Sequence, residues 1–171
     1  MLRACAIIFV PWILAACSPT FNWREVRVEG VSLMAMLPCK PDKGVRTVPL
    51  AGQEVSMRVV GCEAGGATFA ILHAQLPDPS QSDRALAQWK AASLAGMKNS
   101  EALARPFTPA GALGLPASVW VSASGLDQGG SALQTQAAYF AHGRQVFQAI
   151  ILAAQIKPDA AETFFSGLRF E

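Results

Sequence analysis

Apolar and polar residues alternate along the first half of the chain in the manner of strands. Residues 26–37 are mainly apolar with polar residues between them, and Pro38 and Pro41 then interrupt the run. This pattern predicts one strand followed by a loop. Residues 45–50 predict a further short strand for the same reason.

A hairpin is predicted over residues 55–75. Val55, Met57 and Val59 alternate with polar residues, as in a strand with one buried face. Residues 62–66 contain two glycines and predict the turn. The returning strand, residues 69–74, is apolar at both odd and even positions. We therefore expect both of its faces to be covered.

After the hairpin, apolar residues recur every three or four positions instead of every two, which predicts a helix. Ser80 or Ser82 can cap it, because serine accepts a hydrogen bond from an early helical amide. Leu86, Trp89 and Met97 then recur at helical spacing until about Asn99. We expect this stripe to lie on the sheet, with Trp89 in the core.

The second half repeats the plan of strands followed by a helix. Residues 105–115 are rich in proline and glycine and predict an irregular connection. The other expected elements follow in chain order: a strand starting at 119–121, a turn at 127–130, a hairpin of 134–142 and 145–155 across Gly143-Arg144, a helix over 159–166 after Pro158 with Phe164 and Phe165 in the core, and a strand over 168–170.

The order strands, helix, strands, helix predicts an α+β fold, in which helices cover an antiparallel sheet. The sequence also resembles bacterial secreted domains of the PsbP-like fold. The resembling segments are Leu37-Pro38-Cys39-Lys40-Pro41, Gly114-Leu115-Pro116-Ala117, the pairs Tyr139-Phe140 and Val146-Phe147, and the closing run from Phe164 to Phe170. The resemblance implies an α/β sandwich that acts in binding or assembly, and it carries no reaction signature.

The N-terminus has the pattern of an export signal. Arg3 precedes the apolar residues 4–13, which are too few to span a bilayer. Leu14-Ala15-Ala16-Cys17 resembles the bacterial lipobox, whose cysteine carries lipid. We therefore expect a signal peptide over 1–16, lipidation of Cys17, a tether over 17–22 and one globular domain over 23–171. The alternative is an ordinary secretory signal with a coincidental cysteine.

The residue after the lipidated cysteine bears on the choice of membrane. In Gram-negative families with this motif, aspartate there tends to retain the protein at the inner membrane. The residue here is Ser18, so the resemblance implies the outer membrane, with the domain facing the periplasm.

Cysteine usage predicts one disulfide bond. Cys5 leaves with the signal peptide and Cys17 is consumed by lipid, so Cys39 and Cys62 remain. Two thiols in an oxidising compartment favour a bridge, and two separate buried thiols are the alternative. Neither cysteine belongs to a C-x-x-C motif, so neither redox chemistry of the thioredoxin type nor a zinc knuckle is predicted.

Charge and the remaining chemistry narrow the choice of function. The formal net charge is only +2, so nucleic acid is not an expected partner. The two histidines, His73 and His142, lack neighbours at ligand spacing, and no metal or cofactor is predicted. The leading hypothesis is a non-enzymatic envelope lipoprotein that binds another envelope component, most simply a protein. The alternatives are a periplasmic hydrolase that uses His73 with a serine, and a carrier of a small apolar ligand between sheet and helix.

Overall fold

The computed structural model describes residues 20–171, apart from the side chains of residues 99 and 100. The predicted signal peptide, Cys17 and the first part of the tether therefore lie outside the described residues. The elements follow in chain order: β1 (Arg24–Arg27), β2 (Leu33–Leu37), β3 (Asp42–Leu50), β4 (Gln53–Ala64), β5 (Ala67–Gln75), the 3₁₀ turn η1 (Pro79–Gln81), α1 (Ser82–Ala95), β6 (Lys98–Pro106), β7 (Val119–Leu126), β8 (Ala132–His142), β9 (Gln145–Ala153), α2 (Pro158–Ser166) and β10 (Arg169–Phe170).

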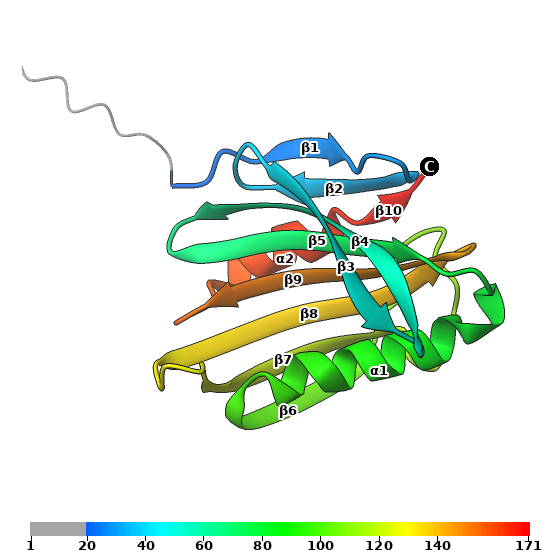
Figure 1. Ribbon diagram of the computed structural model, residues 1–171. Coiled ribbons are helices and arrows are strands. Elements are labelled where there is room, and N and C mark those ends of the chain that lie inside the picture. The colour runs from blue at the N-terminus through cyan, green and yellow to red at the C-terminus, as the bar shows by residue number, and fades with distance from the viewer. Residues whose placement is uncertain (1–19) are drawn as a thin grey trace, which may run out of the picture.

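A seven-stranded antiparallel sheet organises the structure, with the order β3-β4-β5-β9-β8-β7-β6. A small sheet of order β1-β2-β10 and the helix α2 lie on one face, and α1 lies on the other (Figure 1). The predicted α+β class is therefore confirmed. Among residues 20–171, neither α1 nor α2 is long and apolar enough to cross a membrane.

Two apolar clusters hold these layers together, one on each face of the large sheet. Large aromatic side chains such as Phe69, Phe147 and Phe164 fill the cluster beneath α2 and the small sheet. The cluster beneath α1 contains Leu86 and many smaller side chains. Strand β5 contributes Phe69 to the first cluster and Ala74 to the second, which confirms that both of its faces are covered.

Residues 26–37 form two strands, so the prediction of one continuous strand was wrong. β1 and β2 pair as an antiparallel hairpin, with Val26 opposite Ala35. Gly30 has a φ of 80° in the connection, a conformation that glycine adopts without a steric penalty. Apolar residues lie on both sides of this turn, so the hydrophobic pattern of the sequence did not predict it.

The predicted end of the first helix was also wrong. α1 ends at Ala95, and β6 then occupies residues that the sequence assigned to the helix end and to an irregular connection. The residues of β6 from Glu101 to Arg105 are glutamate, alanine, leucine and arginine, all of which favour helices. Pairing with β7 outweighs this local preference.

Strand β4 is longer than the sequence predicted. Cys62 and Glu63, which were expected in a turn, pair with Phe69 and Thr68 of β5. The turn itself is Gly65-Gly66, with φ values of 60° and 75°. These positive values explain why two glycines are needed at this point.

Candidate functional site

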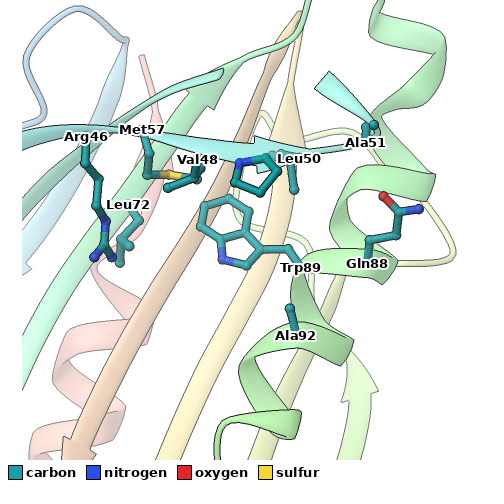
Figure 2. Close-up of a pocket in the computed structure, with 11 residues that line it drawn as sticks. Arg46, Val48, Leu50, Ala51, Met57, Leu72, Gln88, Trp89 and Ala92 are labelled. Carbon is teal, nitrogen blue, oxygen red and sulfur yellow. The ribbon is translucent and has the colours of Figure 1, made fainter. Parts of the chain in front are cut away.

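An apolar groove lies between α1 and the hairpin of β3 and β4, with a volume of about 400 Å³. We call it the α1 groove. Its lining residues are Arg46, Val48, Pro49, Leu50, Ala51, Gly52, Met57, Leu72, Gln88, Trp89 and Ala92. Figure 2 shows the Trp89 ring reaching from α1 towards the hairpin, with Arg46 on one side and Gln88 on the other. Volumes of this size are within the range of small-molecule sites.

The turn between β3 and β4 forms one wall of the α1 groove. Ala51 and Gly52 make a two-residue connection, with φ values of 54° and 82°. Both central residues of such a tight hairpin need positive φ, which an alanine adopts only at a steric cost. Ala51 therefore stores backbone strain at a position that lines the groove.

Trp89 is half-buried rather than a core residue, so this expectation from the sequence was wrong. Its ring packs edge-on against Tyr139, with 6.4 Å between ring centroids, and the rest of the ring faces the groove. Phe164 and Phe165 are 0% and 2% exposed, which confirms the same expectation for them. Trp89 is thus the large aromatic surface of the site.

Hydrogen bonds fix the C-terminal half of α1 onto the sheet behind the groove. Gln148 of β9 donates from Nε2 to the Tyr139 hydroxyl at 2.9 Å and to Ser93 Oγ of α1 at 3.0 Å. Burial raises the pKa of Tyr139, and the hydrogen bonds from Ser93 and Gln148 act in the opposite direction. The phenol therefore stays neutral at physiological pH, and this network holds the wall that carries Trp89.

Arg46 is the charged residue of the α1 groove. Its side chain is exposed, and among residues 20–171 no carboxylate lies within 4.0 Å of it. Apolar side chains such as Met57 and Leu72 lie beside it (Figure 2). This combination suits a molecule with an apolar body and one acidic group. No local pattern in the sequence links Arg46 to α1, so its place in this groove could not be predicted.

His73 is 2% exposed in β5, where its ring stacks on Phe147. Its Nε2 is buried and has no hydrogen-bond partner. Burial lowers the pKa of His73, and the charge of Arg58 lowers it further. A cavity of about 240 Å³ adjoins the ring, and its lining contains Glu29, Lys43 and Arg58 but no serine. The residues that line this cavity therefore do not include the serine that the hydrolase alternative requires.

His142 lies at the end of β8 and is half-buried. Its Nδ1 lies 2.8 Å from the carbonyl oxygen of Gly111, and its ring stacks on Phe170 at 4.2 Å. These contacts tie the turn between β8 and β9 to the C-terminal strand.

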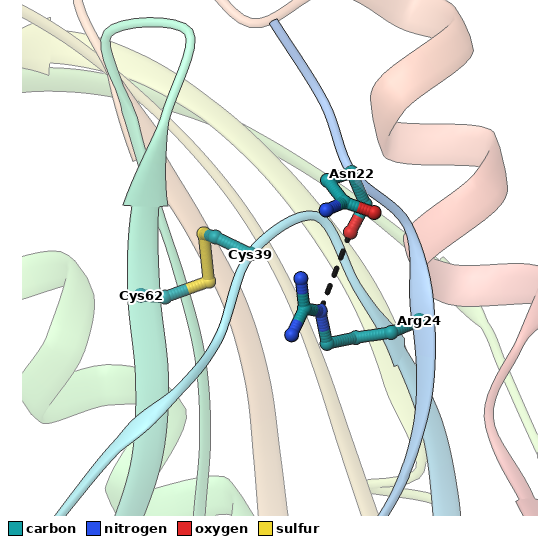
Figure 3. The surroundings of a disulfide bond; sticks show 4 residues. All are labelled: Asn22, Arg24, Cys39 and Cys62. Carbon is teal, nitrogen blue, oxygen red and sulfur yellow. Dashed lines mark hydrogen bonds between the residues drawn. A yellow bond between two sulfur atoms is a disulfide. The ribbon is translucent and has the colours of Figure 1, made fainter. Parts of the chain in front are cut away.

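Cys39 and Cys62 form the predicted disulfide bond, with 6.0 Å between their Cα atoms (Figure 3). Cys39 follows β2, and Cys62 lies in β4. The bond therefore joins the small sheet to the large one. Cys17, the predicted lipidation site, lies outside the described residues.

A second hollow of about 620 Å³ lies on the opposite face of the large sheet, beside α2. Its walls are more polar and include Arg105, Glu162 and Gln136. The Arg105 guanidinium covers the ring of Trp120 at 4.0 Å, and Phe165 packs on that ring at 4.5 Å. Trp120 is therefore covered in part by Arg105 and Phe165.

Among residues 20–171, no three histidine, cysteine, aspartate or glutamate side chains come together as metal ligands could. No protein-family model matches the chain, and a search of curated proteins finds no match.

Proposed function

We propose that the chain is a lipid-anchored protein of the cell envelope whose domain binds a small apolar molecule with an acidic group. The anchor is Cys17 after removal of residues 1–16, and the location is the periplasmic side of the outer membrane. The domain acts without catalysis, as a binding or assembly module of the PsbP-like kind. The α1 groove is the observation that carries the binding proposal.

The chemistry of the groove argues for this ligand class. Apolar side chains and the Trp89 ring would take apolar surface out of water, at about 25 cal/mol per Å². Arg46, which has no carboxylate within reach among the described residues, would pair with the acidic group. A location beside a bilayer would supply molecules of this kind.

A photoactivatable medium-chain fatty acid tests the groove on the full chain. We expect cross-links in peptides that contain Val48, Met57 and Trp89. Ala92→Trp should block labelling, because Ala92 lines the groove, whereas Ala91→Trp on the exposed side of α1 should not. Equal labelling of these two variants would refute the proposal.

Arg46→Gln tests the acidic group separately. Labelling by the fatty acid should fall several-fold, while labelling by the matching alcohol should change little. A fall of the same size for both probes would show that Arg46 acts on the shape of the groove and not through its charge.

Metabolic labelling with palmitate tests the anchor. The parent chain should carry label, and Cys17→Ala should remain at precursor length without label. Labelling of the Cys17→Ala chain would refute this part of the proposal and leave the groove untouched. Another envelope protein as partner is proposed from the sequence resemblance alone.

The hydrolase alternative requires a serine beside His73. The cavity there provides none, and the proposed function does not include it.

A further inference from the structure

The edge of the large sheet at β6 is exposed along most of the strand. β6 is last in the strand order and pairs with β7 on one side (Figure 1). Every residue from 101 to 106 is exposed, and Leu103 is 80% exposed. An edge strand presents unpaired N–H and C=O groups to which another strand can add.

Charges of opposite sign flank Leu103 at equal distances along β6. Glu101 precedes it by two residues and Arg105 follows it by two, so all three side chains lie on one face of the sheet. Among the described residues, neither charge takes part in an ion pair. In the single copy Arg105 lies over the ring of its β7 neighbour Trp120, at 4.0 Å, on this face.

We infer that a second copy of this chain pairs with β6 in antiparallel fashion, about a two-fold axis at Leu103. In this register Leu103 meets Leu103 of the second copy, and Glu101 meets Arg105 of the second copy. The symmetry supplies the same ion pair twice. Directly opposite side chains have Cβ atoms about 4.5–5.5 Å apart, within reach of an ion pair.

In the register about its exposed valine, the other edge of the sheet lacks this self-complementarity. Val45 of β3 is 67% exposed, and the corresponding flanking residues are Lys43 and Thr47. The symmetric register would place lysine opposite threonine, with no pair of opposite charges. Pro49 also removes one N–H from this edge. In a register about Gly44, Asp42 would face Arg46, but the axis there holds no apolar side chain. The combination of an exposed leucine at the axis and opposite charges on both sides of it therefore favours β6.

The paired segment is short, which sets the strength of the association. Pro106 lacks an N–H, and the register of β6 shifts between Lys98 and Glu101. Pairing is thus confined to residues 101–105. Such an interface buries less than about 1,200 Å², so the dimer is transient and forms at high local concentration.

Disulfide trapping in the full chain tests the register. Leu103→Cys should give a cross-linked dimer on mild oxidation, because Cα atoms about 4.5–5.5 Å apart can be bridged. Glu101→Cys alone should not, whereas Glu101→Cys mixed with Arg105→Cys should. The parent chain controls for cross-links through its other cysteines. Val45→Cys controls for pairing at the β3 edge of the sheet.

Charge reversal tests the ion pairs in the Leu103→Cys chain. Glu101→Arg or Arg105→Glu alone should lower the cross-linked fraction roughly tenfold, since like charges then face each other. The double variant Glu101→Arg/Arg105→Glu should restore the cross-linked fraction. Glu54→Arg, which makes an equal charge change at an exposed position of β4, should leave the cross-linked fraction unchanged.

Three results would overturn the inference. The first is an equal cross-linked fraction for Val45→Cys and Leu103→Cys, and the second is the absence of a cross-linked dimer at any protein concentration. The third is a charge-swapped double variant that stays folded by circular dichroism but does not recover the cross-linked fraction. None of these results depends on the groove or on the anchor.

Discussion

Removal of the disulfide bond should destabilise the domain by an amount that follows from the size of the loop it closes. Cys39 and Cys62 are 23 residues apart. In the chain-entropy model a loop of this size costs the unfolded state about 11 cal/mol/K, or about 3.4 kcal/mol at 25 °C. For a domain of this size, each kcal/mol corresponds to roughly 3 °C in Tm. The double variant Cys39→Ala/Cys62→Ala should therefore melt about 10 °C below the parent chain.

Thermal unfolding followed by circular dichroism measures this difference. A reducing agent should lower the Tm of the parent chain towards that of the variant, and it should leave the variant unchanged. If the variant melts within about 2 °C of the parent chain, the loop does not constrain the unfolded state as the model requires.

Three further predictions concern the buried parts of the sheet. The folded-state pKa of His73 lies below its ordinary value of 6.5, so the unfolded chain takes up the proton first. The free energy of unfolding should therefore fall as the pH drops from 6.5 towards the folded-state pKa. Urea unfolding at pH 7.5 and at pH 5.0 should show this fall, and His73→Leu should reduce the difference between the two pH values. Gly61→Ala would place a Cβ 2.6 Å from the carbonyl oxygen of Phe69, so it should lower the free energy of unfolding in urea by about 1–3 kcal/mol. In the control Gly44→Ala the new Cβ would have no atom within 4 Å, and the free energy of unfolding should change by less than about 0.5 kcal/mol. Phe164→Ala, at a fully buried position beside Phe69, should cost about 3–5 kcal/mol, and a loss below about 1 kcal/mol would contradict its place in the core.

The sequence predicted those elements whose turn chemistry and periodicity agree. β8 and β9 join through Gly143-Arg144, and Gly143 has the positive φ that such a turn requires. β6 was missed because its residues favour a helix, and only its neighbour β7 makes it a strand. Local preference and sheet pairing disagree at this strand, and pairing prevails.

The candidate site could be predicted only in part for a similar reason. Trp89 lies on the predicted face of a predicted helix, and the disulfide partners followed from counting cysteines. The other wall of the groove comes from the hairpin of β3 and β4, which is distant in sequence. Whether Trp89 fills the core or lines a groove depends on how closely this hairpin approaches α1, and no spacing within either segment encodes that distance.

The groove lies beside the half of α1 that is less deeply buried. On the α2 face phenylalanines pack beneath α2 and the small sheet, and the hollow on that face lies beside α2. On the other face α1 buries only Ser82, Ala85 and Leu86, all of them in its first half. In its second half Trp89 and Leu94 are half-buried against the cluster beneath α1, and Trp89 and Ala92 line the groove. A molecule bound in the groove would add apolar contacts to this half of the helix, so binding should raise the stability of the domain as well as fill the groove.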